Sequence, residues 1–266
     1  MTTDKMGFMR RFASDEEQDP VVILERKFEQ LIDLSEVERD VLRDLHLATS
    51  VTESRRNLVK AGDRMNEIIL VLDGWVARYK MLADGRRQIV AFLLPGDFID
   101  LYAALFEQSD DSFLAVTEVT YASIPPERLL ELFREHPRLA ALLCWSAGEV
   151  DAILSEHIVR IGRRSAFERV GHLLLELYIR LDHVGLADDR GYDFPLTQEI
   201  IADALGLSLV HVNRTMRRLR DNELVEARDE FLHIVDLQAL VKASRFDRNY
   251  LENRNLPESL LARLLG

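Results

Sequence analysis

Four arginines lie within residues 208–220, a stretch that contains no aspartate or glutamate. If this stretch is helical, Arg214 shares a face with Val210, Arg217 and Arg218, because side chains three or four positions apart are neighbours. The major groove of DNA accepts one α-helix and displays the hydrogen-bonding edges of the bases. We therefore expect this basic face to enter a major groove.

The residue types on this face suggest individual roles. Arg214 can donate two hydrogen bonds to a guanine edge, and Asn213 or His211 can read acceptors on adenine or guanine. Leu209 and Val210 can contact a thymine methyl group but cannot hydrogen-bond to a base. Phosphate contacts set register rather than sequence preference, and the candidates for them are Thr197, Gln198, Ser208, Arg217 and Arg218.

Two short helices joined by a tight turn are needed to hold this face. Thr197 and Ser208 are each placed to cap a helix, and Gly206 suits the left-handed turn that ends the first one. Ala202 is small where two steeply crossing helices must approach closely. This combination is typical of a helix-turn-helix.

A wing and an inward apolar face complete this unit. Residues 223–236 alternate as a short hairpin that turns near 229–230, which is typical of a winged helix. The expected inward face of the second helix consists of Val212, Thr215, Met216 and Leu219. Two alternatives stay open: the arginines form an ordinary solvated face, or the unit belongs to an effector-responsive scaffold that docks an acidic protein partner. Binding that weakens steeply with salt, on a palindromic duplex only, would separate DNA binding from docking.

The chain as a whole is acidic, with a formal net charge of -12 over 266 residues. Residues 161–266 hold 15 basic and 17 acidic side chains, whereas residues 1–160 hold 19 and 29. Affinity for nucleic acid must therefore be local, and the basic run at 208–220 supplies it.

The part of the chain before this unit predicts a strand-rich domain and a long helix. Residues 21–46 are expected to be helical, with a capping box at Ser35 and Glu38. Short apolar runs separated by turns over 54–123 favour an antiparallel barrel or jelly roll. A helix is expected to follow Pro126 and to end near His136.

A long helix over 137–162 follows, and its apolar residues recur in alternating steps of three and four, as at the interface of a two-helix coiled coil. We expect this face to pair two copies of the chain, although packing on its own domain is the alternative. The expected dimer residues are Leu143, Ala147, Val150, Leu154, His157 and Ile161.

Three further features accompany this helix. His157 on the pairing face would either couple dimer geometry to pH or set the helix register. Cys144 is interpreted as a small buried apolar residue. Another helix then leads into a polar linker at 186–195, and residues 241–266 are expected to form a helical extension of undefined role.

Over about residues 25–240 the chain resembles the Crp/Fnr family of bacterial transcription regulators. The resemblance rests on "PGDFIDLYAALFEQSDDS", on the long helix, and on "LTQEIIADALGLSLVHVNRTMRRL" with its wing. It implies an α+β chain with an N-terminal antiparallel jelly roll, a long dimerisation helix and a C-terminal winged helix-turn-helix. It further implies a homodimer that binds a palindromic operator, with RNA polymerase and an unidentified effector as other partners.

On this basis we expect a flexible tail (1–20), a cyclic-nucleotide-binding-like sensor domain (21–136), a dimerisation helix (137–162), a winged helix-turn-helix domain (163–240) and the C-terminal extension (241–266). Within the recognition helix, Arg214 matches the family's guanine-reading arginine. Val210 stands where the family has a glutamate that reads cytosine, and Leu209 replaces a polar residue. The operator should therefore differ from the best-known family site.

The sensor departs further from the cyclic-AMP-binding pattern. Asp111 stands where those members have an arginine for the phosphate, Ser112 matches their serine, and no lysine or arginine occurs from 95 to 124. We therefore expect that the protein does not bind cyclic AMP or cyclic GMP in the usual way. The expected effector pocket consists of Asp97, Phe98, Asp100, Tyr102, Asp111 and Ser112.

We expect no cofactor, no metal and no enzymatic activity. The single cysteine excludes a four-cysteine iron–sulfur cluster in one chain. We interpret His46, His136 and His157 as surface or packing residues, with haem ligation as the alternative. No phosphate-binding loop or paired-histidine metal motif occurs. With no apolar block of signal-peptide length at the N-terminus and no membrane-length apolar run, we expect a cytoplasmic protein without a membrane partner.

Overall fold

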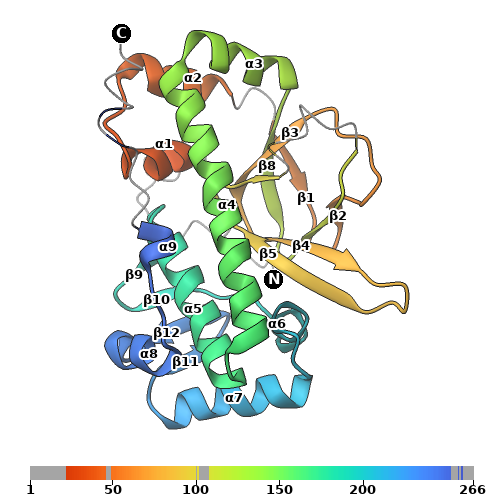
Figure 1. The fold of residues 1–266 in the computed structure, drawn as a ribbon, viewed down its shortest axis with the longest axis vertical. Coiled ribbons are helices and arrows are strands. Elements are labelled where there is room, and N and C mark those ends of the chain that lie inside the picture. Colours follow the sequence, from red (N-terminus) through yellow and green to blue (C-terminus); the bar gives the residue numbers. More distant parts are fainter. Residues whose placement is uncertain are drawn as a thin grey trace, which may run out of the picture.

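The structure is a computed structural model that describes residues 22–45, 49–99, 101, 108–252, 257 and 259. These residues form an N-terminal unit rich in strands, one long helix beside it, and a C-terminal unit of helices with a small sheet (Figure 1). The α+β class predicted from the sequence is confirmed. The expected tail, residues 1–20, lies outside the described residues. No helix among the described residues is long and apolar enough to cross a membrane.

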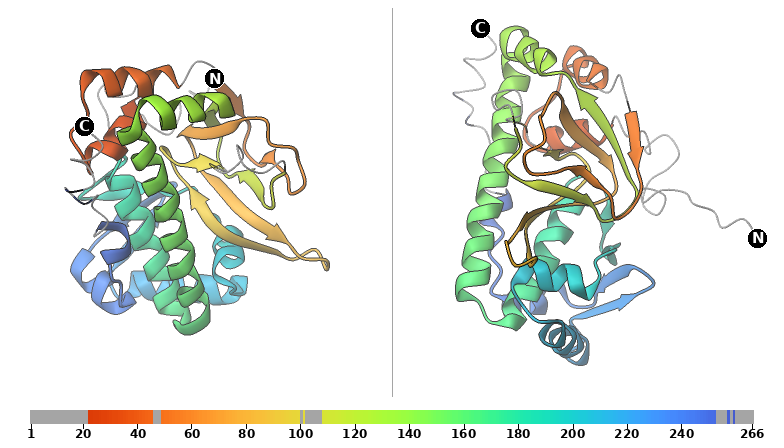
Figure 2. Two further views of the ribbon diagram at one scale, coloured as in Figure 1. Left: turned by 45° about the horizontal axis from the view of Figure 1, so that its top comes forward. Right: turned by 90° about the vertical axis from the view of Figure 1, so that its right-hand side faces the viewer.

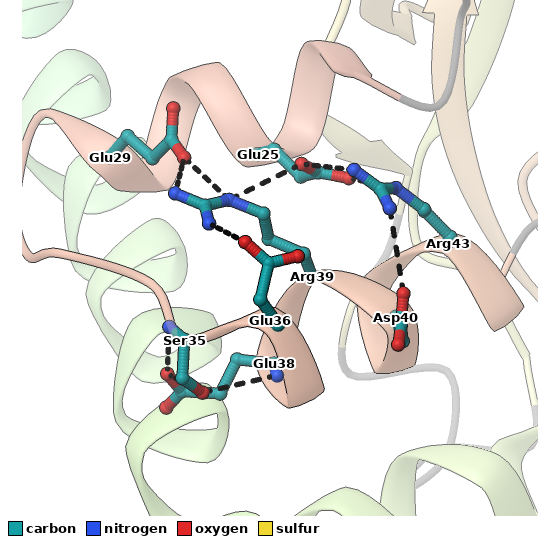
Figure 3. A network of polar contacts seen from close by, with 8 residues as sticks. All are labelled: Glu25, Glu29, Ser35, Glu36, Glu38, Arg39, Asp40 and Arg43. Carbon is teal, nitrogen blue, oxygen red and sulfur yellow. Dashed lines mark hydrogen bonds and ion pairs between the residues drawn. The ribbon is translucent and has the colours of Figure 1, made fainter.

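Two helices precede the strands, α1 (Val22–Glu29) and α2 (Glu36–Asp44). The predicted capping box of α2 is confirmed: the Glu38 carboxylate accepts from the backbone N of Ser35 at 2.8 Å, and Ser35 Oγ accepts from the backbone N of Glu38 at 3.3 Å. Arg39 on α2 reaches back to α1, where its Nη2 lies 2.7 Å from Oε1 of Glu29 (Figure 3). The cap fixes where α2 begins, and the arginine links the two helices.

The strands of the N-terminal unit form two four-stranded antiparallel sheets, one with the order β1-β8-β3-β6 and the other with the order β2-β7-β4-β5. The strands are β1 (Thr49–Thr52), β2 (Asn57–Val59), β3 (Ile68–Asp73), β4 (Val76–Met81), β5 (Arg87–Leu93), β6 (Phe98–Ile99), β7 (Ser112–Ala115) and β8 (Val119–Ile124). Residues 68–72 of β3 are all buried, because this strand lies inside the unit. The predicted jelly roll is therefore confirmed.

Three helices connect the units: α3 (Pro126–Glu135), α4 (Pro137–Arg163) and α5 (Ala166–Asp182). Both α3 and α4 begin at a proline, which fits the first helical turn because its missing N–H has no partner there. Figures 1 and 2 show that α4 runs alongside both units. Only Arg164, which is extended, and Ser165, which caps α5, separate α4 from α5.

The C-terminal unit contains β9 (Ala187–Asp188), β10 (Gly191–Asp193), α6 (Gln198–Leu205), α7 (Leu209–Asp221), β11 (Val225–Arg228), β12 (Phe231–Ile234), α8 (Leu237–Ser244) and α9 (Asn249–Glu252). Its sheet has the order β11-β12-β10-β9. The prediction of a polar linker over 186–195 is therefore wrong, since this segment supplies β9 and β10. Because β9 and β10 are only two and three residues long, no alternation of apolar and polar residues could be recognised in the sequence. Tyr192 anchors the segment, because it is fully buried and its hydroxyl donates to Leu174 O at 2.9 Å.

One hydrophobic cluster crosses from the N-terminal unit into the C-terminal unit. It includes Ile23, Trp75 and Phe92 from the first and Leu174 and Leu205 from the second, each at most 5% exposed. The two units, expected from the sequence to be separate domains, therefore share buried apolar surface.

Candidate nucleic-acid interface

The helices α6 and α7 begin and end where the sequence predicts. Thr197 Oγ1 accepts from the backbone N of Ile200, and Ser208 Oγ accepts from the backbone N of His211, each at 3.3 Å. Gly206 ends α6 in the left-handed region, with φ 61° and ψ 39°. A residue without a Cβ adopts this conformation at no steric cost, so the glycine allows the sharp turn between the helices.

The inward face of α7 packs as predicted. Val212 and Leu219 are fully buried, and Thr215 is 5% exposed. Ala202 on α6 is 8% exposed beneath this face. The apolar contacts fix the roll of α7 about its own axis and so determine which residues face solvent.

The opposite face of α7 is open to solvent. Leu209 and Val210 are 52% and 74% exposed, and His211, Asn213 and Arg214 are also exposed. Asn213 Nδ2 donates to Oε1 of Gln198 at 3.2 Å. This bond links the first residue of α6 to α7 and orients the Asn213 amide.

The arginines of α7 differ in their surroundings. Arg214, Arg217 and Arg220 are exposed, and their guanidinium groups make no hydrogen bond or ion pair with any residue of the described ranges. The guanidinium of Arg218 instead lies over the ring of Phe167, 4.8 Å from its centroid. Arg218, a predicted phosphate contact, is thus also held by a cation–π contact on α5.

The predicted wing is the hairpin β11–β12, whose strands pair from Val225 with Ile234 to Arg228 with Phe231. Asp229 and Glu230 form the turn, both with positive φ. Such a turn matches the right-handed twist of the two strands. The hairpin lies beside the N-terminus of α6, and the groove between them is lined by Thr197, Gln198, Arg220 and Arg228 among others.

The predicted effector residues fall in different places. Asp97, Phe98 and Asp111 line a cavity of about 190 Å³ between the strands of the N-terminal unit and α4. Ser112 is not among the lining residues, and its Oγ accepts from the backbone N of Ala61 at 3.0 Å. Asp100 and Tyr102 lie outside the described residues.

Cations from other segments enter this cavity, so the lack of basic residues between 95 and 124 does not leave it without positive charge. Asp111 pairs with Arg78, at 2.7 Å from Nε, and with Lys80, at 2.8 Å from Nζ. Both cations lie on β4, two positions apart and therefore on the same face of the strand. This spacing is the signal in the sequence that could have identified them. Asp111 is therefore neutralised within the chain.

Asp97 holds together three segments. Its carboxylate lies 2.5 Å from Nζ of Lys27 on α1 and 2.5 Å from Nη2 of Arg180 on α5. Burial alone would raise the pKa of Asp97, but the two cations hold it below its ordinary value. Lys27 also pairs with Glu149 on α4, at 3.0 Å. Asp97 is therefore an anchor between the two units.

Two of the six predicted dimer residues are buried within their own subunit, whereas pairing through the other four stays a prediction. Leu143 and His157 are only 2% and 6% exposed, since both face the interior of their own subunit. Ala147, Val150, Leu154 and Ile161 are half-buried. The exposed stripe lies one residue further along the helix: Ile158 is 67% exposed, and Cys144, interpreted as buried, is also exposed. A helix packed against its own subunit carries an inward apolar stripe that the sequence alone does not distinguish from a pairing stripe.

His157 instead faces a buried polar cluster between α4 and α5. Burial, with a smaller contribution from Arg160, lowers its pKa from 6.5 to about 4. Burial and the same arginine lower the pKa of His172 on α5 to about 2. Both imidazoles are therefore neutral at physiological pH.

Two family models match the chain, the cyclic nucleotide-binding domain over residues 52–136 and the Crp-like helix-turn-helix domain over residues 168–243. The nitrogen fixation regulation protein FixK of Bradyrhizobium diazoefficiens is 39% identical over 150 residues, which are 56% of this chain and 62% of that protein. FixK of Rhizobium meliloti is 32% identical over 65% of this chain and 76% of its own length. The solved structure of FixK2 from Bradyrhizobium japonicum matches with a TM-score of 0.66 and 24% identity, over 74% of this chain and 96% of that one.

Proposed function

The chain belongs to the Crp/Fnr family of transcription regulators, and we propose that it binds a palindromic operator as a homodimer, with α7 as the recognition helix in each half-site. The observation that carries this proposal is the solvent-facing side of α7. It presents three arginines without a partner among the described residues, next to exposed Leu209 and Val210. Exposed, uncompensated guanidinium groups are ready to meet phosphates and guanine edges.

The contacts on DNA divide by residue type. Arg214 reads guanine, and Leu209 and Val210 contact thymine methyl groups. Arg217, together with Thr197 and Ser208 at the helix N-termini, contacts phosphates, where helix dipoles also favour negative charge. Polar readout is therefore concentrated at Arg214 and its neighbour Asn213.

Pairing of two chains would use the exposed residues of α4, which include Ile158 and Val159, 67% and 44% exposed. Burying these side chains against a second copy is favourable, because apolar surface leaves water. The two-fold axis then sets the half-sites about 34 Å apart, or about 10–10.5 base pairs. RNA polymerase is a further proposed partner.

Regulation would act by shifting the population of two arrangements of the recognition helices. The effector cavity does not suit a cyclic nucleotide bound in the usual way, because Arg78 and Lys80 are already paired with Asp111 and Ser112 does not line the cavity. A cyclic phosphate would have to displace the Asp111 carboxylate from these two cations. Calorimetric titration with cyclic AMP should give no binding at micromolar concentrations, and micromolar binding would overturn this part of the proposal.

Selection of bound duplexes from a random pool tests the DNA-binding proposal. We expect a palindrome with the half-site spacing given above, and binding that weakens steeply between low and physiological salt. Arg214→Ala should relax the preference at one base pair in each half-site, by about 1–3 kcal/mol. If the variant ranks all sites as the unmodified protein does, Arg214 is not a base reader. Binding without sequence preference would favour the scaffold alternative.

A further inference from the structure

The segment that follows α8 turns back towards α4. Ser244 is fully buried, and α8 approaches α5 so closely that a Cβ on Gly171 would lie 2.0 Å from Ser244 Oγ. Arg245 then adopts a left-handed conformation with φ 50°, which redirects the chain. The short helix α9 that follows packs against α4 (Figure 1). Residues 245–252, which we name the C-terminal clamp, therefore start on the DNA-binding unit and end on the long helix.

Two aromatic rings of the clamp enclose His172 of α5. The Phe246 ring meets the imidazole edge to face at 4.6 Å between centroids, and the Tyr250 ring stacks on it at 5.9 Å. The Tyr250 hydroxyl donates to Oε2 of Glu176, one turn further along α5, at 2.7 Å. Burial and the Glu176 carboxylate raise the pKa of Tyr250, so the hydroxyl keeps its proton as a donor.

The same Glu176 oxygen binds Arg160 of α4. Arg160 Nε also donates to Nδ1 of His172 at 3.2 Å. Arg160, His172 and Glu176 are at most 3% exposed. Glu176 thus receives one donor from the long helix and one from the clamp, at a position that is almost fully buried.

A third interaction lies at the junction of α4 and α5. Arg164, the extended residue between these helices, donates from Nη1 to the backbone O of Arg245 at 2.8 Å and pairs with Glu156 of α4. The first residue of the clamp is therefore bonded to the junction itself. Rotation about the junction would have to break this bond and the bonds to Glu176 together.

We propose that the C-terminal clamp fixes the angle between α4 and α5, with Tyr250 as a positioning residue for the recognition helix; the proposal rests on the dimeric operator binding proposed above. Because α7 packs on α5 and the proposed dimer axis lies along α4, this angle sets the distance between the two recognition helices. The clamp narrows the range of half-site spacings that the dimer accepts.

The test compares Tyr250→Phe with Tyr178→Phe in the full chain. The first variant removes only the hydroxyl that reaches Glu176. The second makes the same change on α5, where the hydroxyl makes no hydrogen bond with a described residue. The probes are the palindromic duplex obtained by selection, the same duplex lengthened or shortened by one base pair at its centre, and a duplex with a single half-site. Amide hydrogen exchange across residues 161–168 is measured without DNA.

Tyr250→Phe should reduce the preference for the selected spacing roughly tenfold, as expected when a hydrogen bond to a charged group is removed. Its affinity for the single half-site should stay unchanged, and the amides of residues 161–168 should exchange faster. Tyr178→Phe should behave as the unmodified protein does in each measurement.

Two results would overturn the proposal that the C-terminal clamp fixes the angle between α4 and α5. One is an unchanged spacing preference and unchanged exchange in Tyr250→Phe. The other is an equal loss of affinity for all duplexes, which would indicate a merely structural role. If the unmodified protein itself shows no spacing preference, the proposed function fails instead, and the exchange measurement alone then decides whether the clamp restrains the junction.

Discussion

The arginines on the outer face of α7 and those between α4 and α5 belong to the same chain but have opposite surroundings. Arg214 and Arg217 face solvent with no partner among the described residues, whereas Arg160 is 1% exposed and bonded to Glu176 and His172. An unpaired guanidinium on the surface keeps its full capacity to bind an external anion. A buried one must satisfy its charge within the chain. Whether an arginine is paired within the chain, rather than its residue type, therefore distinguishes an arginine that is available to an external anion from one that stabilises the fold.

The largest effect is expected where the charge is buried. Arg160→Ala leaves the buried Glu176 without the cation that binds it, so the free energy of unfolding should fall by about 3–5 kcal/mol. Chemical denaturation at fixed protein concentration measures this change. The double variant Arg160→Met, Glu176→Leu removes both charges and should recover part of the stability, because the buried Tyr250 hydroxyl still loses its acceptor. Arg217→Ala, the surface control, should lie within about 0.5 kcal/mol of the unmodified protein, and an equal decrease in both single variants would refute the contrast.

The buried histidines predict a dependence of stability on pH. Their folded-state pKa values, about 4 for His157 and about 2 for His172, lie below the 6.5 of the free side chain. Below pH 6.5 the unfolded chain therefore binds protons that the folded chain does not. The contribution of these histidines to the free energy of unfolding is fully present above pH 6.5. It decreases towards pH 4, by about 1.4 kcal/mol per pH unit for each histidine. Unfolding of His157→Gln, followed from pH 7 to 4, should show the slope reduced by one histidine's share, and an unchanged slope would contradict burial of His157.

A gain in discrimination between base pairs is expected on the exposed face of α7. Val210 is 74% exposed, so Val210→Glu can be accommodated without disturbing the packing of α7. A carboxylate there can accept from the amino group of cytosine, which should add about 1–3 kcal/mol of discrimination at one base pair. Competition between duplexes that differ at that position measures it. Val210→Gln is the matched control, because it has the same shape and no charge.

The smallest effect concerns a single phosphate. Arg217→Ala should weaken binding to all duplexes alike, and the slope of log affinity against log salt should become shallower by about 0.9 for each phosphate that the protein no longer neutralises. Titrations at several salt concentrations measure the slope. A change in sequence ranking, rather than in slope, would show that Arg217 reads bases.

Local signals made part of the molecule predictable. The caps at Ser35, Thr197 and Ser208 and the left-handed Gly206 act within a few residues, so each could be placed from the sequence. The periodicity of 137–162 likewise predicted the long helix, which extends from Pro137 to Arg163.

Long-range interactions were not predictable in the same way. Arg78 and Lys80 neutralise Asp111 from 33 and 31 positions away in the chain, and Arg180 reaches Asp97 across 83 positions. Leu143 and His157 on α4 were assigned to the dimer face although both are buried in their own subunit, because apolar periodicity does not say which of two neighbours a helix face covers. Such features depend on how the units meet in space.

The hydrophobic cluster shared by the two units limits how this chain could be recombined with its relatives. If the C-terminal unit were replaced by one with a different surface, Ile23, Trp75 and Phe92, now at most 5% exposed, would lose part of their apolar surroundings. A chimaera joined at the α4–α5 junction would therefore need matching substitutions on α1, in the β3–β4 turn and on β5. Exchange of one unit alone is therefore expected to destabilise the fold.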